Sequence, residues 1–172
     1  MSNNGLTPAQ RGTANHKFME LADFSDSDIE AQLERFVEEG KLTSAQAQAV
    51  DKEKMRVFLG SDICRRIRAS SEVYREKPFT CEMTAGEIYP GVTGKAAEET
   101  VIIEGVADIA FVENGKLVIV DYKTDYNVTK DKLRLRYSGQ LGIYAQCLEK
   151  TLGIEVKETC IYSFFLGETV KI

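Results

Sequence analysis

Three residues that could carry out chemistry stand out in the stretch GVADIAFVENGKLVIVDYKTD, residues 105 to 125: Asp108, Asp121 and Lys123. They interrupt two apolar runs on either side of Asn114-Gly115, a dipeptide typical of a two-residue hairpin turn because both residues tolerate positive φ. If these two residues form the turn, paired positions sum to 229 and Asp108 lies directly opposite Asp121. Opposed side chains have Cβ atoms about 4.5 to 5.5 Å apart, and like charges at that distance are destabilising. The pair therefore needs a compensating positive charge.

Two kinds of positive group could supply this compensation. A divalent cation such as Mg²⁺ is commonly held by one or two carboxylates and several waters. Lys123 shares the face of Asp121 by the two-residue period of a strand, so it could then orient a water or stabilise a developing charge. The alternative is that Lys123 alone neutralises the aspartates in a structural ion pair. Burying carboxylates costs several kcal/mol unless they are compensated, which favours the metal.

The neighbouring side chains predict that both strands are central in a sheet. With strict alternation, Val106, Ala110 and Val112 share the face of Asp108, whereas Ala107 lies on the opposite face. Both faces are apolar, which is typical of strands that are covered on both sides.

The segments before this hairpin are predicted to be mainly helical. SDSDIEAQLERFVEEG offers Ser27 and Glu30 as a capping box and Gly40 as a stop. The next segment, TSAQAQAVDKEKMRVFLGS, predicts a second helix that begins with Thr43 and Gln46, so the two form a helical hairpin. A shorter helix at about 61–70 and a strand in EVYREKPFTCEM follow. Residues 84–100 are rich in Gly, Thr and small residues and predict a long loop.

The segments after the hairpin are a helix at about 129–152 and a strand in VKETCIYSFFLG. The resulting order is helices, strand, hairpin, helix, strand, which predicts an α/β domain with a mixed sheet covered by helices.

The composition indicates one ordinary globular domain of 172 residues, with 43% hydrophobic and 28% charged residues. The net charge of −5 argues against bulk attraction to nucleic acid, but residues 123–137 hold five cations and two anions beside the carboxylates. Four widely spaced cysteines predict buried thiols without a zinc or iron–sulfur site. The sequence lacks a nucleotide-binding G-x-x-x-x-G-K-[ST] motif, a signal peptide and a membrane-spanning run, so we expect a cytoplasmic location and no ATP site.

Four stretches in this order resemble motifs of the PD-(D/E)XK nucleases, and more narrowly of their RecB-like branch. They are RGTANH with His16, YREKPF with Glu76, Asp108 followed by DYK at 121–123, and YSGQLGIYA with Gln140 and Tyr144. Together with the helical hairpin, they look most like the nuclease domains of AddA-type subunits of bacterial helicase–nucleases.

This resemblance implies a restriction-endonuclease-like mixed sheet flanked by helices, with a helical portion at about 13–70 and a catalytic core at about 71–172. It implies Mg²⁺, with Mn²⁺ as a substitute, bound by His16, Asp108, Asp121 and the backbone carbonyl of Tyr122, and Lys123 acting on the water or the scissile phosphate. The implied reaction is hydrolysis of DNA strands delivered by a helicase during double-strand-break repair. The implied partners are DNA, an AddB-like subunit and a helicase region of the same, longer polypeptide, from which this domain is excised.

The remaining candidates carry two interpretations each. A lone histidine is more often structural than a ligand, but His16 follows Gly12 by one helical turn and gains weight from the aspartates. Gln140 lies at the edge of an apolar helix stripe that includes Tyr144, so it could touch a phosphate or anchor the metal-site strand, while Tyr144 could be a core aromatic. Lys132 and Arg136 could form a basic surface toward DNA or simply a solvated helix face. Glu76 could support the metal site or form an ion pair with Arg75 or Lys77.

Two other functions stay open from the sequence. One is a catalytically silent nucleic-acid-binding or scaffolding module of the same fold. The other is a stand-alone phage or CRISPR-type nuclease of the same superfamily.

Overall fold

The hairpin around Asn114-Gly115 is present in the computed structural model, which describes residues 7–172. Strands β2 (Thr100–Glu113) and β3 (Lys116–Lys123) flank the turn, whose two residues have φ of 54° and 75°. The ladder runs from Glu113 opposite Lys116 to Ile109 opposite Val120, so every pair sums to 229 and the predicted register is confirmed. The next pair in that register is Asp108 and Asp121, one step beyond the last rung of the ladder.

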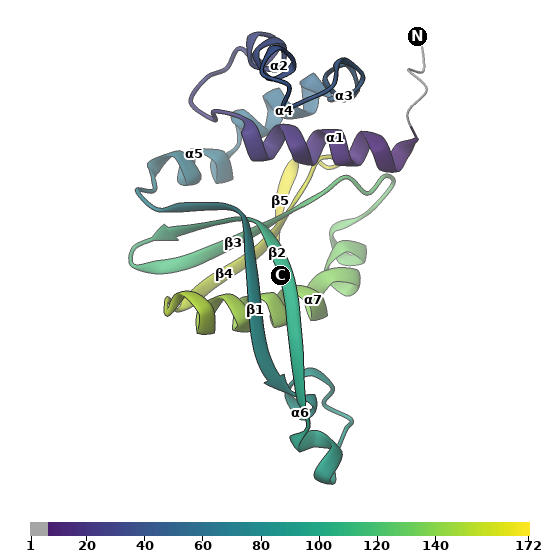
Figure 1. Ribbon diagram of the computed structural model, residues 1–172, viewed down its shortest axis with the longest axis vertical. Coiled ribbons are helices and arrows are strands. Elements are labelled where there is room, and N and C mark those ends of the chain that lie inside the picture. The colour runs from purple at the N-terminus through teal and green to yellow at the C-terminus, as the bar shows by residue number, and fades with distance from the viewer. Residues whose placement is uncertain (1–6) are drawn as a thin grey trace. The chain divides into compact units, whose positions relative to one another are not determined.

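Five strands form one sheet in the order β1-β2-β3-β4-β5 (Figure 1). The other strands are β1 (Val73–Thr84), β4 (Val156–Ser163) and β5 (Glu168–Lys171). Helix α7 (Lys130–Leu152) connects β3 to β4 and begins with Thr129 as its N-cap, close to the predicted start. The α/β class with a mixed sheet is therefore confirmed, with β5 as a strand that the sequence did not predict.

The strand directions follow from the hydrogen bonds. Strand β2 is antiparallel to both β1 and β3. Between β3 and β4, the Leu117 N–H donates to the Glu155 carbonyl and the Phe164 N–H donates to the Lys123 carbonyl, so residue numbers rise together and the two strands are parallel. The Gly167 and Ile172 N–H groups donate to the Ser163 and Thr159 carbonyls, which makes the last two strands an antiparallel pair. A helical crossover between parallel neighbours is the expected connection.

The chain divides into two compact units that share the strands of this sheet. The helical unit comprises residues up to 71 together with 122–128 and 162–169, and the sheet unit comprises 72–121, 129–161 and 170–172. The chain passes from one unit to the other between Asp121 and Tyr122 in β3, and again between Ile161 and Tyr162 in β4.

The helical unit contains five helices in its described part: α1 (Pro8–Leu21), α2 (Ile29–Glu38), α3 (Ser44–Ala49), α4 (Lys52–Leu59) and α5 (Asp62–Ala69). The capping box of Thr43 and Gln46 is confirmed, but the N-cap of α2 is Asp28 and not Ser27. The predicted second helix of the hairpin is two helices, because Val50 is extended with ψ of 127° and the Asp51 side chain accepts from the Lys54 N–H to start α4.

Aromatic rings from separate parts of the sequence form the core of the helical unit. The Phe58 ring of α4 lies 5.1 Å from that of Phe24, 5.7 Å from Tyr122 and 4.9 Å from Tyr162. These edge-to-face contacts are the preferred geometry of aromatic pairs. The ends of β3 and β4 therefore contribute core residues to this unit.

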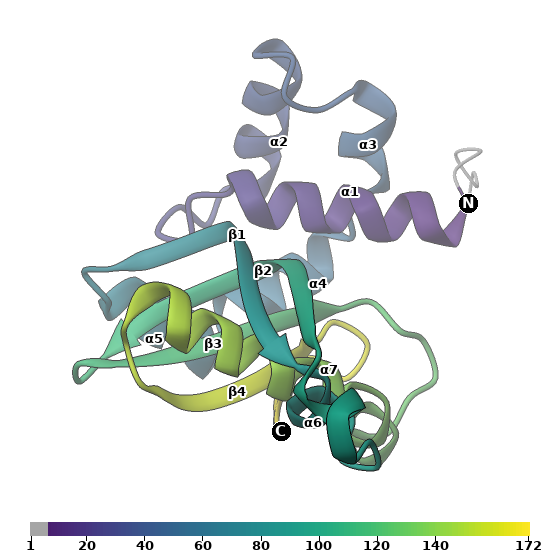
Figure 2. The ribbon, with the colours of Figure 1, turned by 60° about the horizontal axis from the view of Figure 1, so that its bottom comes forward.

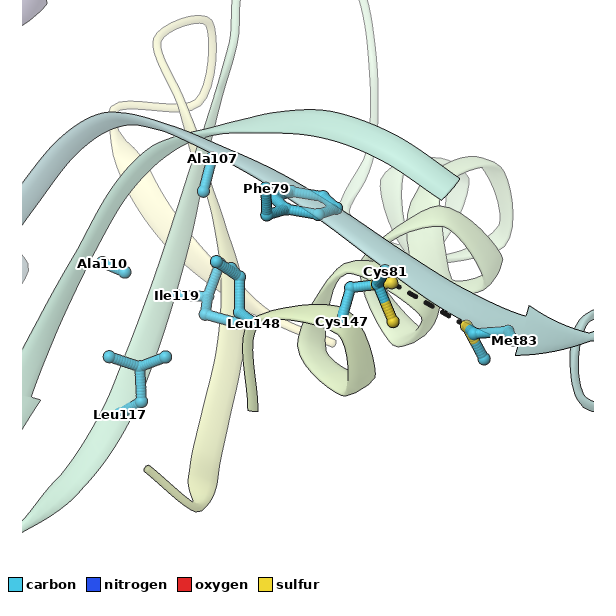
Figure 3. Packing of buried hydrophobic residues seen from close by; sticks show 9 residues of the cluster. All are labelled: Phe79, Cys81, Met83, Ala107, Ala110, Leu117, Ile119, Cys147 and Leu148. Carbon is cyan, nitrogen blue, oxygen red and sulfur yellow. Dashed lines mark hydrogen bonds between the residues drawn. The ribbon is translucent and has the colours of Figure 1, made fainter. Parts of the chain in front are cut away.

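The sheet unit has its own apolar core between the sheet and α7 (Figure 3). Its buried residues are Phe79, Cys81, Met83, Ala107, Ala110, Leu117, Ile119, Cys147 and Leu148. Figure 2 shows the short helix α6 (Ala85–Ile88) and the 3₁₀ helix η1 (Gly94–Glu98) at the far ends of β1 and β2. The predicted loop at 84–100 thus contains two short helices, of which α6 begins with a capping box of Thr84 and Glu87.

All four cysteines are buried, and no disulfide is found within residues 7–172. None of the helices in the same range is both long and apolar enough to cross a membrane. The prediction that the sequence lacks a signal peptide also concerns residues 1–6, which lie outside the described part.

Candidate metal centre

Two carboxylates meet across β1 and β2 in the sheet unit. Arg75 pairs with Ile109 and Lys77 pairs with Ala107, so Glu76 and Asp108 occupy the rung between them, which the ladder omits. Glu76 has φ of 42°, a left-handed conformation that is rare for a side chain of this kind within a strand. The two residues are half-buried, and each offers a carboxylate oxygen within 4.8 Å of the other.

This rung is also the point at which the alternation of both strands breaks. On one side of this rung the even-numbered residues, Tyr74 of β1 and Ala110 of β2, pack in the core beneath α7. On the other side the odd-numbered residues, Phe79 of β1 and Ala107 of β2, do so. The predicted faces of Val106 and Ala107 are therefore wrong: Val106 is 45% exposed and Ala107 is buried. The physical reason is that the backbone leaves the regular extended conformation at this rung, where Glu76 is left-handed, although the register on either side stays one to one and no residue is inserted.

Asp121 extends this row of acids to a third strand. It is 8% exposed at the end of the sheet unit's part of β3, next in register to Asp108. Tyr122 follows it and is 2% exposed, with its ring 5.7 Å from Phe58 in the helical unit. Lys123 is half-buried, and its carbonyl accepts the Phe164 N–H at 3.0 Å. The parallel partner strand thus holds the backbone of β3 immediately beyond the acid.

His16 lies beside the same segment within the helical unit. It is half-buried on α1, and its ring meets that of Tyr122 edge to face at 6.1 Å. One turn earlier, a Cβ added to Gly12 would lie only 3.2 Å from the Thr124 hydroxyl oxygen. Glycine therefore lets α1 approach the chain that follows Lys123, and this explains physically why glycine and histidine are spaced by four residues here.

The sequence matches the family model of the PD-(D/E)XK nuclease superfamily over residues 2–170. The chain belongs to this superfamily. Similar proteins include those from Acetivibrio thermocellus (42% identical over 95% of this chain), Ruminiclostridium cellulolyticum (39% over 98%) and Bacillus cytotoxicus (37% over 99%). Each is named as a subunit of an ATP-dependent helicase/nuclease, and the matched region is 13% to 15% of its length.

The donor set suits the divalent metals that PD-(D/E)XK nucleases generally use. Carboxylate oxygens are the ligands that hard cations such as Mg²⁺ and Mn²⁺ prefer. Glu76 and Asp108 bring two such oxygens within 4.8 Å of each other on half-buried side chains. A cation there would offset a like-charge contact that is otherwise unfavourable, so the residues present fit the group.

Four candidate residues from the sequence lie on α7, as predicted: Lys132, Arg136, Gln140 and Tyr144. Gln140 is exposed, and its Nε2 donates to the Tyr144 hydroxyl at 3.1 Å. The Tyr144 ring packs edge to face on Phe79 at 4.9 Å, which agrees with the interpretation as a core aromatic. Lys132 and Arg136 are exposed on the same helix. The hydrogen bond of Gln140 is thus within α7, and does not join the helix to β3.

The sequence leaves Glu76 open between an acid that supports the metal and a partner of Arg75 or Lys77, and the structure places it next to Asp108. The pairing of β1 with β2 sets the two residues opposite each other, and Glu76 takes a left-handed backbone conformation there, which glutamate in a strand-like sequence does not reveal.

Proposed function

We propose that this chain is a divalent-metal-dependent deoxyribonuclease domain that hydrolyses phosphodiester bonds of DNA strands. The observation that carries the proposal is the row of Glu76, Asp108 and Asp121 across three neighbouring strands in a member of a nuclease superfamily. In this row the β1–β2 ladder omits a rung and the β2–β3 ladder ends. Acids gathered at a break in a sheet contribute little to folding, and a position in which strain is retained is a reasonable place for function.

The metal in this proposal is Mg²⁺, with Mn²⁺ as a substitute. Asp108, Asp121, the Tyr122 carbonyl and His16 would hold it, with Glu76 close to Asp108. The support for His16 is its ring contact with Tyr122, which is bonded to Asp121. When bound, such a cation polarises a phosphoryl oxygen and lowers the pKa of a coordinated water.

The protein's own residues have separate tasks in this reaction. Lys123 shares a side of β3 with Asp121, so its ammonium group would orient the attacking water or stabilise charge on the phosphate. Its backbone is held by the Phe164 N–H, and Tyr122 is fixed among the aromatic rings. These contacts keep the donors of β3 in place before substrate arrives, which is the role of preorganisation. Lys132, Arg136 and Gln140 are exposed on α7 and would contact backbone phosphates.

The biological setting is also a proposal. Because the similar proteins are named as subunits of an ATP-dependent helicase/nuclease, we infer that this chain is the nuclease part of a longer polypeptide. Its helicase region would deliver unwound strands, and an AddB-like second subunit would complete the assembly in double-strand-break repair in the bacterial cytoplasm.

The test compares two lysines of one strand. Lys123→Met and Asp121→Asn should each reduce Mg²⁺-dependent cleavage of single-stranded DNA by at least 100-fold, because removal of one preorganised group costs about that much. Lys116→Met is the matched control, since Lys116 begins the same strand, is exposed and pairs with Glu155 at 2.7 Å. It should leave cleavage unchanged.

Circular dichroism establishes that each variant is folded. Equal cleavage by wild type and all three variants contradicts the proposal. DNA binding without cleavage by the wild type, in Mg²⁺ and in Mn²⁺, identifies a catalytically silent module instead.

A further inference from the structure

A cavity of about 470 Å³ lies entirely within the helical unit, beside the segment that leaves β3. Its walls come from α1, from the break between α3 and α4, and from the chain after Lys123. We propose that this cavity binds an unstacked nucleobase of a single DNA strand, with the Tyr126 ring as its stacking surface. The inference rests on the proposed nuclease function, to which it adds a binding site for one base beside the cleaved bond.

Tyr126 is the residue that points most directly to a ligand. It is 81% exposed, although a tyrosine is largely apolar and this one lies in a cavity wall. Its ring meets that of Phe165 edge to face at 4.8 Å, so a second aromatic ring supports it from the side. Asn127, which follows, has φ of 53°, a conformation that turns the chain sharply after the tyrosine. A ring that is supported and also exposed is the usual platform for base stacking.

The charges around the cavity suit the phosphates of a strand. Arg11 and Lys54 contribute two cations to the lining, and Asp51 contributes one carboxylate. That carboxylate pairs with Lys54 at 3.3 Å and also accepts the Lys54 N–H as the cap of α4. Its role is therefore largely structural. The lining keeps one positive charge in excess, in a chain whose net charge is −5.

The position of the cavity links it to the proposed reaction. Thr124 follows Lys123 directly and lies in the cavity wall, and Tyr126 is two residues further on. A strand whose scissile phosphate lies at Lys123 would therefore present its neighbouring nucleotide to the cavity. The volume is within the range of small-ligand sites, about 300 to 1,000 Å³.

This site selects for single strands. A base in a duplex is stacked and paired, so it can enter a cavity only after both interactions are lost, at a cost of a few kcal/mol. A base in a single strand is available at a much smaller cost. Stacking on an aromatic ring does not depend on the identity of the base, so the preference concerns strandedness and not sequence.

The experiment measures binding separately from cleavage. The full chain with Asp121→Asn, which leaves DNA intact under the proposed mechanism, is titrated into a fluorescent single-stranded dT oligonucleotide and into a duplex of equal length. Adding Tyr126→Ala should weaken single-strand binding about 5- to 140-fold, the change that corresponds to one base–aromatic stack. Tyr126→Phe should retain the affinity, and duplex binding should not change.

The matched control is Tyr89→Ala, which removes another exposed tyrosine, 58% accessible, from the sheet unit. It should bind like the parent. A second probe is a strand with one abasic nucleotide scanned along its length. At one position of the abasic nucleotide, the loss of affinity should not add to the loss caused by Tyr126→Ala. Both changes remove the same stack between a base and the tyrosine ring.

The outcomes separate the two proposals. If wild type cleaves single strands but Tyr126→Ala binds and cleaves as well as wild type, the base site is refuted and the nuclease function stands. If wild type does not cleave but its single-strand affinity depends on Tyr126, the nuclease function fails and the base site stands. Equal weakening by Tyr126→Ala and Tyr89→Ala would also refute the base site.

Discussion

The contact between Glu76 and Asp108 should destabilise the fold without metal and stabilise it when a divalent cation is bound. Their nearest carboxylate oxygens lie within 4.8 Å of each other. At that separation two unit charges repel by ~0.9 kcal/mol at the dielectric constant of water and by ~3.5 kcal/mol at an effective value of about 20. Because both side chains are half-buried, the repulsion should fall between these limits.

A double-mutant cycle of Glu76→Gln and Asp108→Asn isolates this pair from the other contacts of each residue. In EDTA each single variant relieves the whole repulsion, so the double variant should gain less stability than the two single effects together. The difference should be between ~1 and ~3.5 kcal/mol, or roughly 2 to 4 °C of melting temperature per kcal/mol for a chain of this size. In saturating Mn²⁺ each single variant loses metal stabilisation, so the double variant should lose less than the two together.

The assay is thermal or urea unfolding of the four proteins, with and without metal. Additive effects within about 0.5 kcal/mol in EDTA would mean that the two charges do not interact. A coupling with the same sign in EDTA and in Mn²⁺ would refute the reasoning that these carboxylates share a cation.

Two further predictions concern stability. Burial raises the pKa of Tyr162 to about 12, so the folded state favours its neutral form. This contribution is fully present below pH 10.0, the ordinary value, and is lost as the pH rises towards 12, by ~2.7 kcal/mol in total. The Tyr162 hydroxyl has no hydrogen-bond partner within residues 7–172, so Tyr162→Phe should keep or raise the stability at neutral pH. The variant should also lose less stability than the wild type as the pH rises from 10 to 12, as measured by urea unfolding. Equal losses in the two proteins would contradict the assignment to Tyr162. Gly105→Ala should destabilise the chain by about 1 to 3 kcal/mol through overpacking, because its Cβ would lie 2.5 Å from the Phe79 ring. Phe79→Leu should reduce that cost in the double variant, and additive effects in urea unfolding would show that the clash is not the cause.

The sequence predicts the hairpin and its register well because the determinant is local. Asn114 and Gly115 both need positive φ in the turn, and these two residue types tolerate it. The pairing of β2 and β3 then follows by counting, and it places Asp108 next to Asp121. The start of α7 is equally local, because the Thr129 side chain accepts the Lys132 N–H.

The sequence fails where a distant contact decides the backbone. Strict alternation misplaces Val106 and Ala107, because the alternation breaks at the rung of Asp108, where Glu76 on the neighbouring strand takes a left-handed conformation. The helix predicted from Thr43 onward divides at Val50, which is buried in the helical unit and extended. Strand β5 follows a short turn after β4 and has only four residues, too few for a clear alternation.

The aromatic cluster of the helical unit determines how the chain can be shortened. A truncation that begins at residue 72 would keep all five strands and the three acids, and from the sequence it resembles a minimal catalytic core. It would nevertheless remove Phe58 from the rings of Tyr122 and Tyr162, which lie near the ends of β3 and β4, and would remove Phe24, which packs on Phe58. We expect the fragment to expose apolar surface one residue from Asp121 and to aggregate, so the helices before residue 72 should belong to the smallest fragment that folds.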